Sequence, residues 1–228
     1  MKRAIFGIGT VSEAIVGMFS NQIKFDLAVV DAEFYKHSTW LGIPVLTYEE
    51  YVKQIVLGED QFVVGVGYGN SNLQRKEVFS RLVSAGAIPM NLIHESSFVA
   101  STAILESGVL IFPFACVENS VTIKEGTIIW SNSLIGHNSS VGEFCFLAGS
   151  VTIGGSVSIE NYCVVGIGAS IGNNVEIGSK AIIGGGAIVM KHVTKSSVII
   201  NPSSPALGLP SEYFEKLGGF DHLKKTNQ

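Results

Sequence analysis

Aliphatic residues recur at every sixth position through the second half of the chain. Counting in sixes from Val99 to Val189, each position holds valine, isoleucine or leucine without an exception. At an overall hydrophobic content of 46%, so regular a column does not arise by chance. A helix of 3.6 residues per turn cannot keep this period on one face, whereas three short strands per turn can. The pattern predicts a coil with the cross-section of a triangular prism.

Two further columns share the period. From Ala103 onward, the position two before each aliphatic residue is small or valine, and the position after it is often glycine. Residues eighteen positions apart, such as Ile135 and Ile153, stack and form the core, where each contributes about 1.5–3 kcal/mol. Because ordering the chain costs about 1–2 kcal/mol per residue, neighbouring turns must stabilise one another.

We interpret the glycines that follow the aliphatic column as corners that need backbone freedom. They are Gly136, Gly142, Gly154, Gly166, Gly172, Gly178 and Gly184.

Short apolar runs alternate with amphipathic segments before the coil, which predicts a small parallel α/β domain over residues 1–93. The expected strands are Lys2–Phe6, Leu27–Val30, Phe62–Val66 and Ala87–Ile93, and the expected helices are Val11–Phe19, Thr47–Ile55 and Asn70–Ala85. Ile43–Leu46 is a further short apolar run. Thr47 and Glu50 have the spacing of a capping box.

The second predicted domain spans residues 94–228. Its period is expected to fail after Val189, and Pro202 and Pro205 to end regular structure. Ser211–Leu217 is expected to form a short helix that caps the open end of the coil.

Composition limits the class of protein. The 228 residues carry a net charge of −4 and give a pI near 5.7, which argues against a nucleic-acid binder. The apolar start Lys2–Gly7 is too brief for a signal peptide or a membrane span, so we expect a cytoplasmic protein. Cys116, Cys145 and Cys163 have no metal-ligand spacing, and we expect them to be reduced, with the last two stacked and facing inward.

Two glycine-rich turns each follow a strand and open a helix. Gly7-x-Gly9-x-x-Ser12, with Asp31 about twenty residues on, partly matches a dinucleotide fingerprint, and Gly65-x-Gly67-x-Gly69 is the second turn. The free amides of a helix N-terminus suit a phosphate. Nucleotide binding is the favoured interpretation, and plain packing or a redox cofactor are the alternatives.

His137 is the single histidine within the repeats, two positions after Ile135, so its ring is expected to project outward. An outward imidazole is ordinarily a surface group. It can also accept a proton at neutral pH, as acyl transfer to an amine requires, while backbone amides hold the oxyanion. We expect His94 and His192 to be structural. Lys191, Lys195 and Arg75 are either solvated or in contact with ligand phosphates.

Four segments of the coil combine the aliphatic column with its neighbouring small residues and glycines: Ile128–Asn138, Gly142–Phe144, Gly166–Ala169 and Gly184–Ala187. Together they resemble the hexapeptide-repeat acyltransferases. Taken whole, the chain is similar to the sugar acyltransferases related to sialic acid O-acetyltransferase and to bacterial N-acetyltransferases of nucleotide-linked 4-amino-6-deoxysugars.

The resemblance implies a left-handed parallel β-helix, a homotrimer and acetyl-CoA bound between adjacent coils. It implies that His137 is the proton acceptor, and that the first glycine turn and Asp31 hold a nucleotide sugar. Gly67 joins these substrate-binding residues because the two glycine turns converge. The resemblance also places the coenzyme against the backbone near Ile167 and Gly185. The substrate-binding residues of the first turn are Gly9, Thr10 and Val11.

Two positions depart from the pattern of these enzymes. Asn138 stands beside the base where the best-known relatives carry an acidic residue, and Phe146 stands where some relatives place a second histidine near the thioester. We include Asn138 among the catalytic residues and Phe146 among the coenzyme-binding residues.

The sequence therefore predicts an acetyl-CoA-dependent N-acetyltransferase that acts on a UDP-linked or dTDP-linked amino-deoxysugar for glycan assembly, without a metal. The amine attacks the thioester directly and His137 is the general base. An O-acetyltransferase of a sialic-acid-like sugar is the alternative within enzymes. A non-catalytic nucleotide-sugar-binding protein and a zinc-dependent carbonic anhydrase on the same coil are alternatives from other classes.

Overall fold

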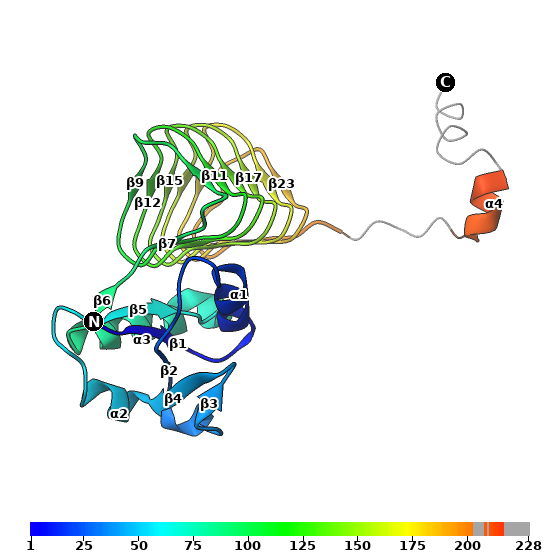
Figure 1. The fold of residues 1–228 in the computed structure, drawn as a ribbon. Coiled ribbons are helices and arrows are strands. Elements are labelled where there is room, and N and C mark those ends of the chain that lie inside the picture. The colour runs from blue at the N-terminus through cyan, green and yellow to red at the C-terminus, as the bar shows by residue number, and fades with distance from the viewer. Residues whose placement is uncertain (203–207, 209, 217–228) are drawn as a thin grey trace.

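The structure is a computed structural model that describes residues 1–202, 208 and 210–216 (Figure 1). An α/β unit comes first, with a six-stranded sheet in the order β3-β4-β2-β1-β5-β6. Its elements are β1 (Arg3–Phe6), α1 (Thr10–Met18), β2 (Leu27–Val30), η1 (Ala32–Phe34), β3 (Thr39–Trp40), β4 (Ile43–Thr47), α2 (Tyr48–Val52), β5 (Gln61–Val64), η2 (Gly69–Asn72), α3 (Leu73–Ser84) and β6 (Ile88–Pro89).

The predicted elements of this unit form, and the apolar run Ile43–Leu46 lies in strand β4. The helix predicted over Asn70–Ala85 is α-helical only from Leu73, and three further differences concern the sheet and α2. The edge strand β3 was not predicted and pairs antiparallel with β4, so the sheet is mixed rather than wholly parallel. The predicted strand Ala87–Ile93 is split, because Ile88–Pro89 pairs with β5 whereas Leu92–Ile93 pairs with the coil. The helix predicted over Thr47–Ile55 ends at Val52, although its capping box is present.

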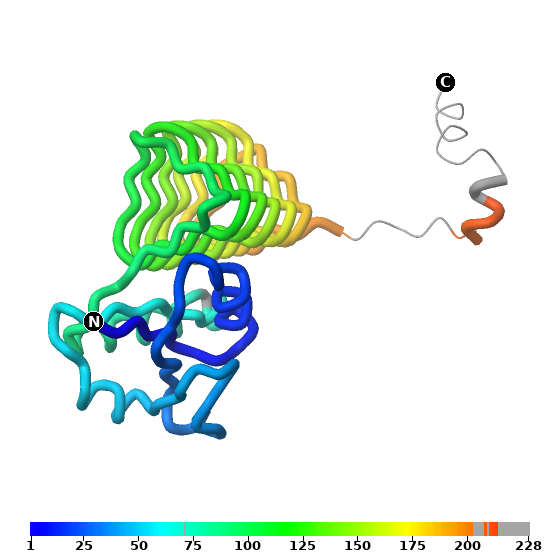
Figure 2. The backbone as a smooth tube through the Cα atoms, in the orientation of Figure 1, coloured from blue at the N-terminus to red at the C-terminus, as the bar shows by residue number. Residues whose placement is uncertain are grey.

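From β7 to β24 the chain coils into three parallel sheets that form the sides of a prism, as the smooth trace shows (Figure 2). The first sheet contains β7 (Leu92–Ile93), β10 (Leu110–Ile111), β13 (Ile128–Ile129), β16 (Phe146–Leu147), β19 (Val164–Val165), β22 (Ile182–Ile183) and β24 (Val198–Ile199). The second contains β8 (Phe98–Val99), β11 (Cys116–Val117), β14 (Leu134–Ile135), β17 (Thr152–Ile153), β20 (Ser170–Ile171) and β23 (Ile188–Val189). The third contains β9 (Ile104–Leu105), β12 (Thr122–Ile123), β15 (Ser140–Val141), β18 (Ser158–Ile159) and β21 (Glu176–Ile177).

The aliphatic column forms the core of this coil, as predicted. Strands eighteen residues apart pair in register, for example Ile135 with Ile153. From Ile111 to Val189 every residue of the column is at most 5% exposed. Cys145 and Cys163 belong to the same core, and both are free thiols.

The glycines that follow the aliphatic column serve a purpose other than the predicted one. Gly136 and Gly178 do not have positive φ. A Cβ atom at Gly136 would lie 2.6 Å from the carbonyl carbon of Gly154, and one at Gly178 would lie 2.5 Å from the nitrogen of Lys195. Positive φ occurs two residues later, where non-glycine residues such as Asn138 adopt it. These glycines are therefore required by the close approach of successive coils and not by backbone freedom.

The six-residue period fails after Val189, as predicted, although the coil itself continues for one more turn. Val193 forms a bridge with Ile177, and β24 pairs Ile199 with Ile183. Both partners are sixteen residues apart instead of eighteen, so the last turn is shorter by two residues.

The α/β unit packs on the first sheet of the coil. The outward residues of that sheet are apolar, and Leu92, Leu110, Ile128 and Phe146 are buried in one cluster with the α/β unit. Phe19, just after α1, packs edge to face on Phe112 at 5.5 Å between ring centroids. One sheet of the coil therefore supports the α/β unit.

Near the C-terminus, helix α4 forms over Ser211–Lys216. Figure 1 draws it apart from the coil, so its predicted capping role stays a prediction, and Pro205 and Leu217 lie outside the described residues. No helix in the described ranges is long and apolar enough to cross a membrane.

Candidate functional site

Both glycine turns lie at the carboxyl edge of the N-terminal sheet, where β1 and β5 end side by side. Ser12 is fully buried, and its hydroxyl donates a hydrogen bond to the carbonyl oxygen of Gly65 at 3.2 Å. A Cβ atom at Gly65 would lie 2.0 Å from the Ser12 hydroxyl oxygen. The serine that replaces the third glycine of the fingerprint thus joins the two turns, and Gly65 makes room for it.

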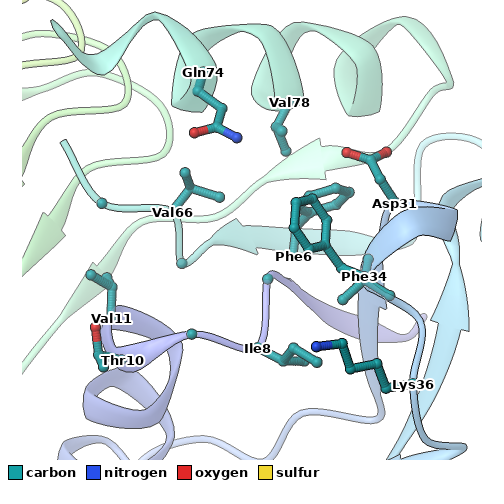
Figure 3. Close-up of a pocket in the computed structure, with 15 residues that line it drawn as sticks. Phe6, Ile8, Thr10, Val11, Asp31, Phe34, Lys36, Val66, Gln74 and Val78 are labelled. Carbon is teal, nitrogen blue, oxygen red and sulfur yellow. The ribbon is translucent and has the colours of Figure 1, made fainter. Parts of the chain in front are cut away.

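A cavity of about 430 Å³ opens between the two turns (Figure 3). All five residues predicted to bind the substrate line it: Gly9, Thr10, Val11, Asp31 and Gly67. Helix α1 begins here without a side-chain cap, so its first amides remain available to an anion. The cavity therefore offers an anion site at a helix N-terminus, next to an acidic strand end.

Asp31 is held at the edge of this cavity by Arg81 of α3. The guanidinium donates two hydrogen bonds to the carboxylate, at 2.6 and 3.2 Å, and lies over the ring of Tyr48 at 4.1 Å from its centroid. The hydrogen bond to Asp31 raises the pKa of Arg81. This pairing fixes the Asp31 carboxylate, which keeps further lone pairs for a hydroxyl or N–H donor of a ligand.

Sequence reasoning missed three polar or aromatic residues that also line the cavity. Gln74 of α3 points into it, and the Lys36 side chain extends to the neighbourhood of Ile8 (Figure 3). Phe34 is 49% exposed and lies in the short turn after Asp31. Their only sequence signal was their position after strand ends, because the motif itself does not include them.

Arg75 is neither solvated nor open to a ligand, which corrects both expectations for it. The side chain is 1% exposed and lies between α3 and the coil. Burial lowers its pKa to about 10, so the guanidinium is protonated at neutral pH.

His137 lies at the corner between the second and third sheets of the coil and is exposed, as predicted. Its backbone N–H donates to a carboxylate oxygen of Glu118 at 2.8 Å. A Cβ atom on Gly155 would lie 2.6 Å from Cε1 and 2.7 Å from Nε2 of the imidazole. The ring therefore rests against Gly155 of the next coil, which holds it in place.

Asn138 lies beside the imidazole and adopts a positive φ of 59°. Its amide nitrogen lies 3.3 Å from Nδ1 of His137. In this orientation Asn138 donates to Nδ1, and the proton of the neutral ring is on Nε2. With the amide oxygen and nitrogen exchanged, Asn138 accepts from Nδ1–H and the lone pair of the imidazole is on Nε2. Asn138 can thus select the tautomer without supplying a charge.

Two of the residues predicted to bind the coenzyme lie together. Ile167 is 68% exposed, and its carbonyl oxygen accepts a hydrogen bond from the N–H of Gly186 at 2.8 Å. A Cβ atom on Gly185 would lie 3.3 Å from this side chain. Ile167 and Gly185 thus form an exposed ledge on successive coils.

The structure does not place Phe146 on that ledge. Its side chain is 5% exposed and packs on Tyr68 and Trp130, in the contact between the α/β unit and the coil. The outward column of the first sheet is covered by the α/β unit, which explains the burial. We therefore leave Phe146 out of the coenzyme site.

His137 and Ile167 lie at different corners of the prism. Ile167 follows β19 of the first sheet, whereas His137 follows β14 of the second. One side of the prism is six residues long, or up to about 20 Å, and two turns along the axis add about 10 Å. One chain therefore does not bring these two residues together.

Within the ranges that the structure describes, no three His, Cys, Asp or Glu side chains gather as metal ligands.

Comparisons with known proteins find close matches in fold. PerB from Caulobacter crescentus, solved in complex with CoA and GDP-perosamine, is 22% identical and has a TM-score of 0.77, with 87% of this chain and 93% of that chain covered. The acetyltransferase domain of PglB from Neisseria gonorrhoeae is 20% identical with a TM-score of 0.78, covering 90% of this chain and 99% of that one. WeeI from Acinetobacter baumannii has 20% identity and a TM-score of 0.76 over the same shares.

This chain has the fold of those proteins. The predicted fold class, an α/β domain followed by a left-handed parallel β-helix, is confirmed. No protein-family model matches the sequence, and no curated protein matches it.

Proposed function

We propose that this protein is an acetyl-CoA-dependent N-acetyltransferase whose acceptor is the amino group of a nucleotide-linked deoxysugar. The main support is the single cavity that collects Gly9, Thr10, Val11, Asp31 and Gly67. Its free helix amides suit a diphosphate, and Asp31 suits a ribose or base donor. The same fold carries CoA and a GDP-linked amino sugar in PerB.

His137 is the general base in this proposal. The amine of the sugar attacks the thioester carbonyl, and its proton passes to Nε2 of His137 as the new C–N bond forms. The tetrahedral intermediate then expels CoA as a thiolate, which takes up a proton and leaves the amide product. In this proposal the Asn138 amide is turned so that its oxygen accepts the hydrogen bond from Nδ1–H, which keeps the lone pair on Nε2.

A homotrimer completes the site in this proposal. Since His137 and the ledge formed by Ile167 and Gly185 lie at different corners, acetyl-CoA bound in a seam between two subunits would contact the ledge of one and the histidine of the other. We place the reaction in the cytoplasm, where acetyl-CoA and nucleotide sugars are available. The nucleotide is UDP or dTDP, and GDP is the comparison to include because of PerB.

The activity is tested with purified protein, acetyl-CoA and a panel of UDP-, dTDP- and GDP-linked amino sugars, by following released thiol and the mass of the sugar. We expect the His137→Ala variant to lose about 10²- to 10⁴-fold in kcat. The His192→Gln variant is the control, because that imidazole accepts a backbone hydrogen bond from Glu176 and has no part in the proposed reaction. Equal turnover by wild type and His137→Ala would refute the role of His137 as the base.

Transfer to hydroxyl sugars alone would favour the O-acetyltransferase, and nucleotide-sugar binding without acetyl-CoA binding would favour a non-catalytic protein.

The shared site is tested by subunit mixing. His137→Ala and Gly185→Trp subunits are each expected to be inactive alone. In randomly mixed trimers about a quarter of the seams combine an intact histidine with an intact ledge, so activity should return to about that fraction. No recovery in mixed trimers would place the complete site within one subunit.

A further inference from the structure

Arg75 is the buried charge that the proposed reaction does not use. A guanidinium has five N–H donors, and all five of Arg75 have protein acceptors. Nη1 donates to the Gly67 carbonyl oxygen at 3.3 Å and to Asn72 Oδ1 at 2.8 Å. Nε donates to the Gly126 carbonyl oxygen at 3.2 Å. Nη2 donates to the carbonyl oxygens of Phe144 and Cys145, at 2.9 and 3.0 Å.

These acceptors belong to two different units of the fold. Gly67 lines the cavity in the second glycine turn, whereas Gly126, Phe144 and Cys145 lie at a corner of the coil. Asn72 strengthens the connection, because its side-chain nitrogen donates to the carbonyl oxygens of Tyr162 and Cys163, at 3.4 and 3.3 Å. One guanidinium and one amide therefore tie the wall of the cavity to the coil.

The coil that Arg75 contacts is also the one that carries His137. From His137 the chain runs through β15 directly to Phe144 and Cys145. The core residues between them, Ser139 and Val141, are at most 2% exposed, and well-packed interiors deform little. The position of the glycine turn relative to His137 is thus set through a short, rigid path.

The electrostatic arrangement is unusual for a residue that only fills space. No carboxylate pairs with Arg75 in the described residues, and its charge is balanced by carbonyl oxygens alone. A buried charge is costly, and an apolar side chain of similar volume often stabilises a fold as well. A guanidinium with five directed bonds adds what an apolar residue lacks, a fixed orientation of its partners.

We propose that Arg75, together with Asn72, is a positioning residue that fixes the second glycine turn against the His137 coil, so that a bound acceptor is aligned for acetyl transfer. This inference rests on the proposed function for its kinetic consequence. Its structural part, the fixed placement of the turn on the coil, can be measured without turnover.

The experiment compares three variants. Arg75→Lys keeps the charge but can make at most three of the five hydrogen bonds. Asn72→Gly keeps the backbone, whose φ of 64° suits glycine, and removes the side-chain bonds. Phe79→Leu is the control. It weakens the same contact between the two units, where Phe79 packs on Phe144 at 5.3 Å between ring centroids, but the Phe79 side chain has no hydrogen-bonding group that could hold the turn.

Two readouts are combined with thermal unfolding of each variant. Nitroxide labels on cysteines introduced at exposed Glu49 and Glu176 report the distance between the α/β unit and the coil, in a Cys116→Ser background diluted with unlabelled protein. Steady-state kinetics gives kcat and both KM values. For Arg75→Lys and Asn72→Gly we expect a broader distance distribution, a kcat lowered about 10- to 100-fold and a KM for acetyl-CoA within about twofold. Phe79→Leu should lower the unfolding temperature while kcat stays within about twofold.

An unchanged kcat and an unchanged distance distribution in both variants would overturn the proposal. So would a loss of kcat in Phe79→Leu as large as in Arg75→Lys, because stability alone would then explain it. If the wild-type protein acetylates no sugar, the proposed function fails, and the distance distributions still decide whether Arg75 and Asn72 fix the turn.

Discussion

Replacing Gly155 with alanine should slow acetyl transfer while leaving the fold stable. The new Cβ would lie 2.6 Å from Cε1 of His137, and an ordinary contact needs about 3.4 Å, so the imidazole must shift by about 0.8 Å. A misplacement of about 1 Å can lower a rate by about 10²-fold. The clash involves the far end of an exposed side chain and Gly155 does not have positive φ, so the backbone can accept alanine, with a gain of about 0.4–1 kcal/mol from the unfolded state.

The assay measures kcat and the unfolding midpoint on the same preparation. Gly17→Ala is the matched control, since a Cβ there meets nothing within 4 Å and the residue lies in α1. We expect kcat to fall by about 10- to 100-fold in Gly155→Ala and to stay unchanged in Gly17→Ala. A Gly155→Ala enzyme with wild-type kcat would show that the position of the imidazole does not limit the reaction, and would refute this reasoning.

Three further predictions concern stability and binding. Gly178→Ala should lower the free energy of unfolding by about 1–3 kcal/mol or more, because the new Cβ would lie 2.5 Å from the backbone nitrogen of Lys195. A denaturant titration that shows no loss of stability would contradict this prediction. Burial, with Asp60 nearby, raises the pKa of Tyr51 to about 12. The free energy of unfolding should therefore fall by roughly 3 kcal/mol as pH rises from about 10 to 12. Tyr51→Phe should flatten that alkaline loss of stability, and equal losses in the variant and the wild type would count against the reasoning. Asp31→Asn should raise the KM of the nucleotide sugar about 10-fold or more and leave the KM of acetyl-CoA unchanged, because a hydrogen bond to a charged group is worth about 1.5–3 kcal/mol. A parallel rise of both KM values would argue against a specific role of Asp31 in binding the sugar.

Local and periodic features were readable from the sequence. The six-residue column predicted a coil with its aliphatic core, and the structure confirms it from Ile111 to Val189. The glycine turns followed predicted strands, and because parallel strands end at one edge, their convergence was expected as well. The structure brings the five predicted substrate residues to one cavity, while their contacts with a ligand stay a prediction.

Other features were misjudged because they depend on neighbours that the local sequence does not show. Phe146 occupies an outward position of the coil, and only the packing of the α/β unit reveals that it is covered. The glycines after the aliphatic column looked like conformational corners, yet it is the distance to the next coil that excludes a side chain at Gly136.

The sequence by itself determined the coil, the α/β unit before it, the two glycine turns and the outward placement of His137, because each depends on residues close in sequence or on a strict repeat. Only the tertiary structure decided that Arg75 is buried with every donor bonded, and that His137 and Ile167 stand at different corners of the prism. Those properties are set by distances between segments tens of residues apart, which a one-dimensional pattern does not encode.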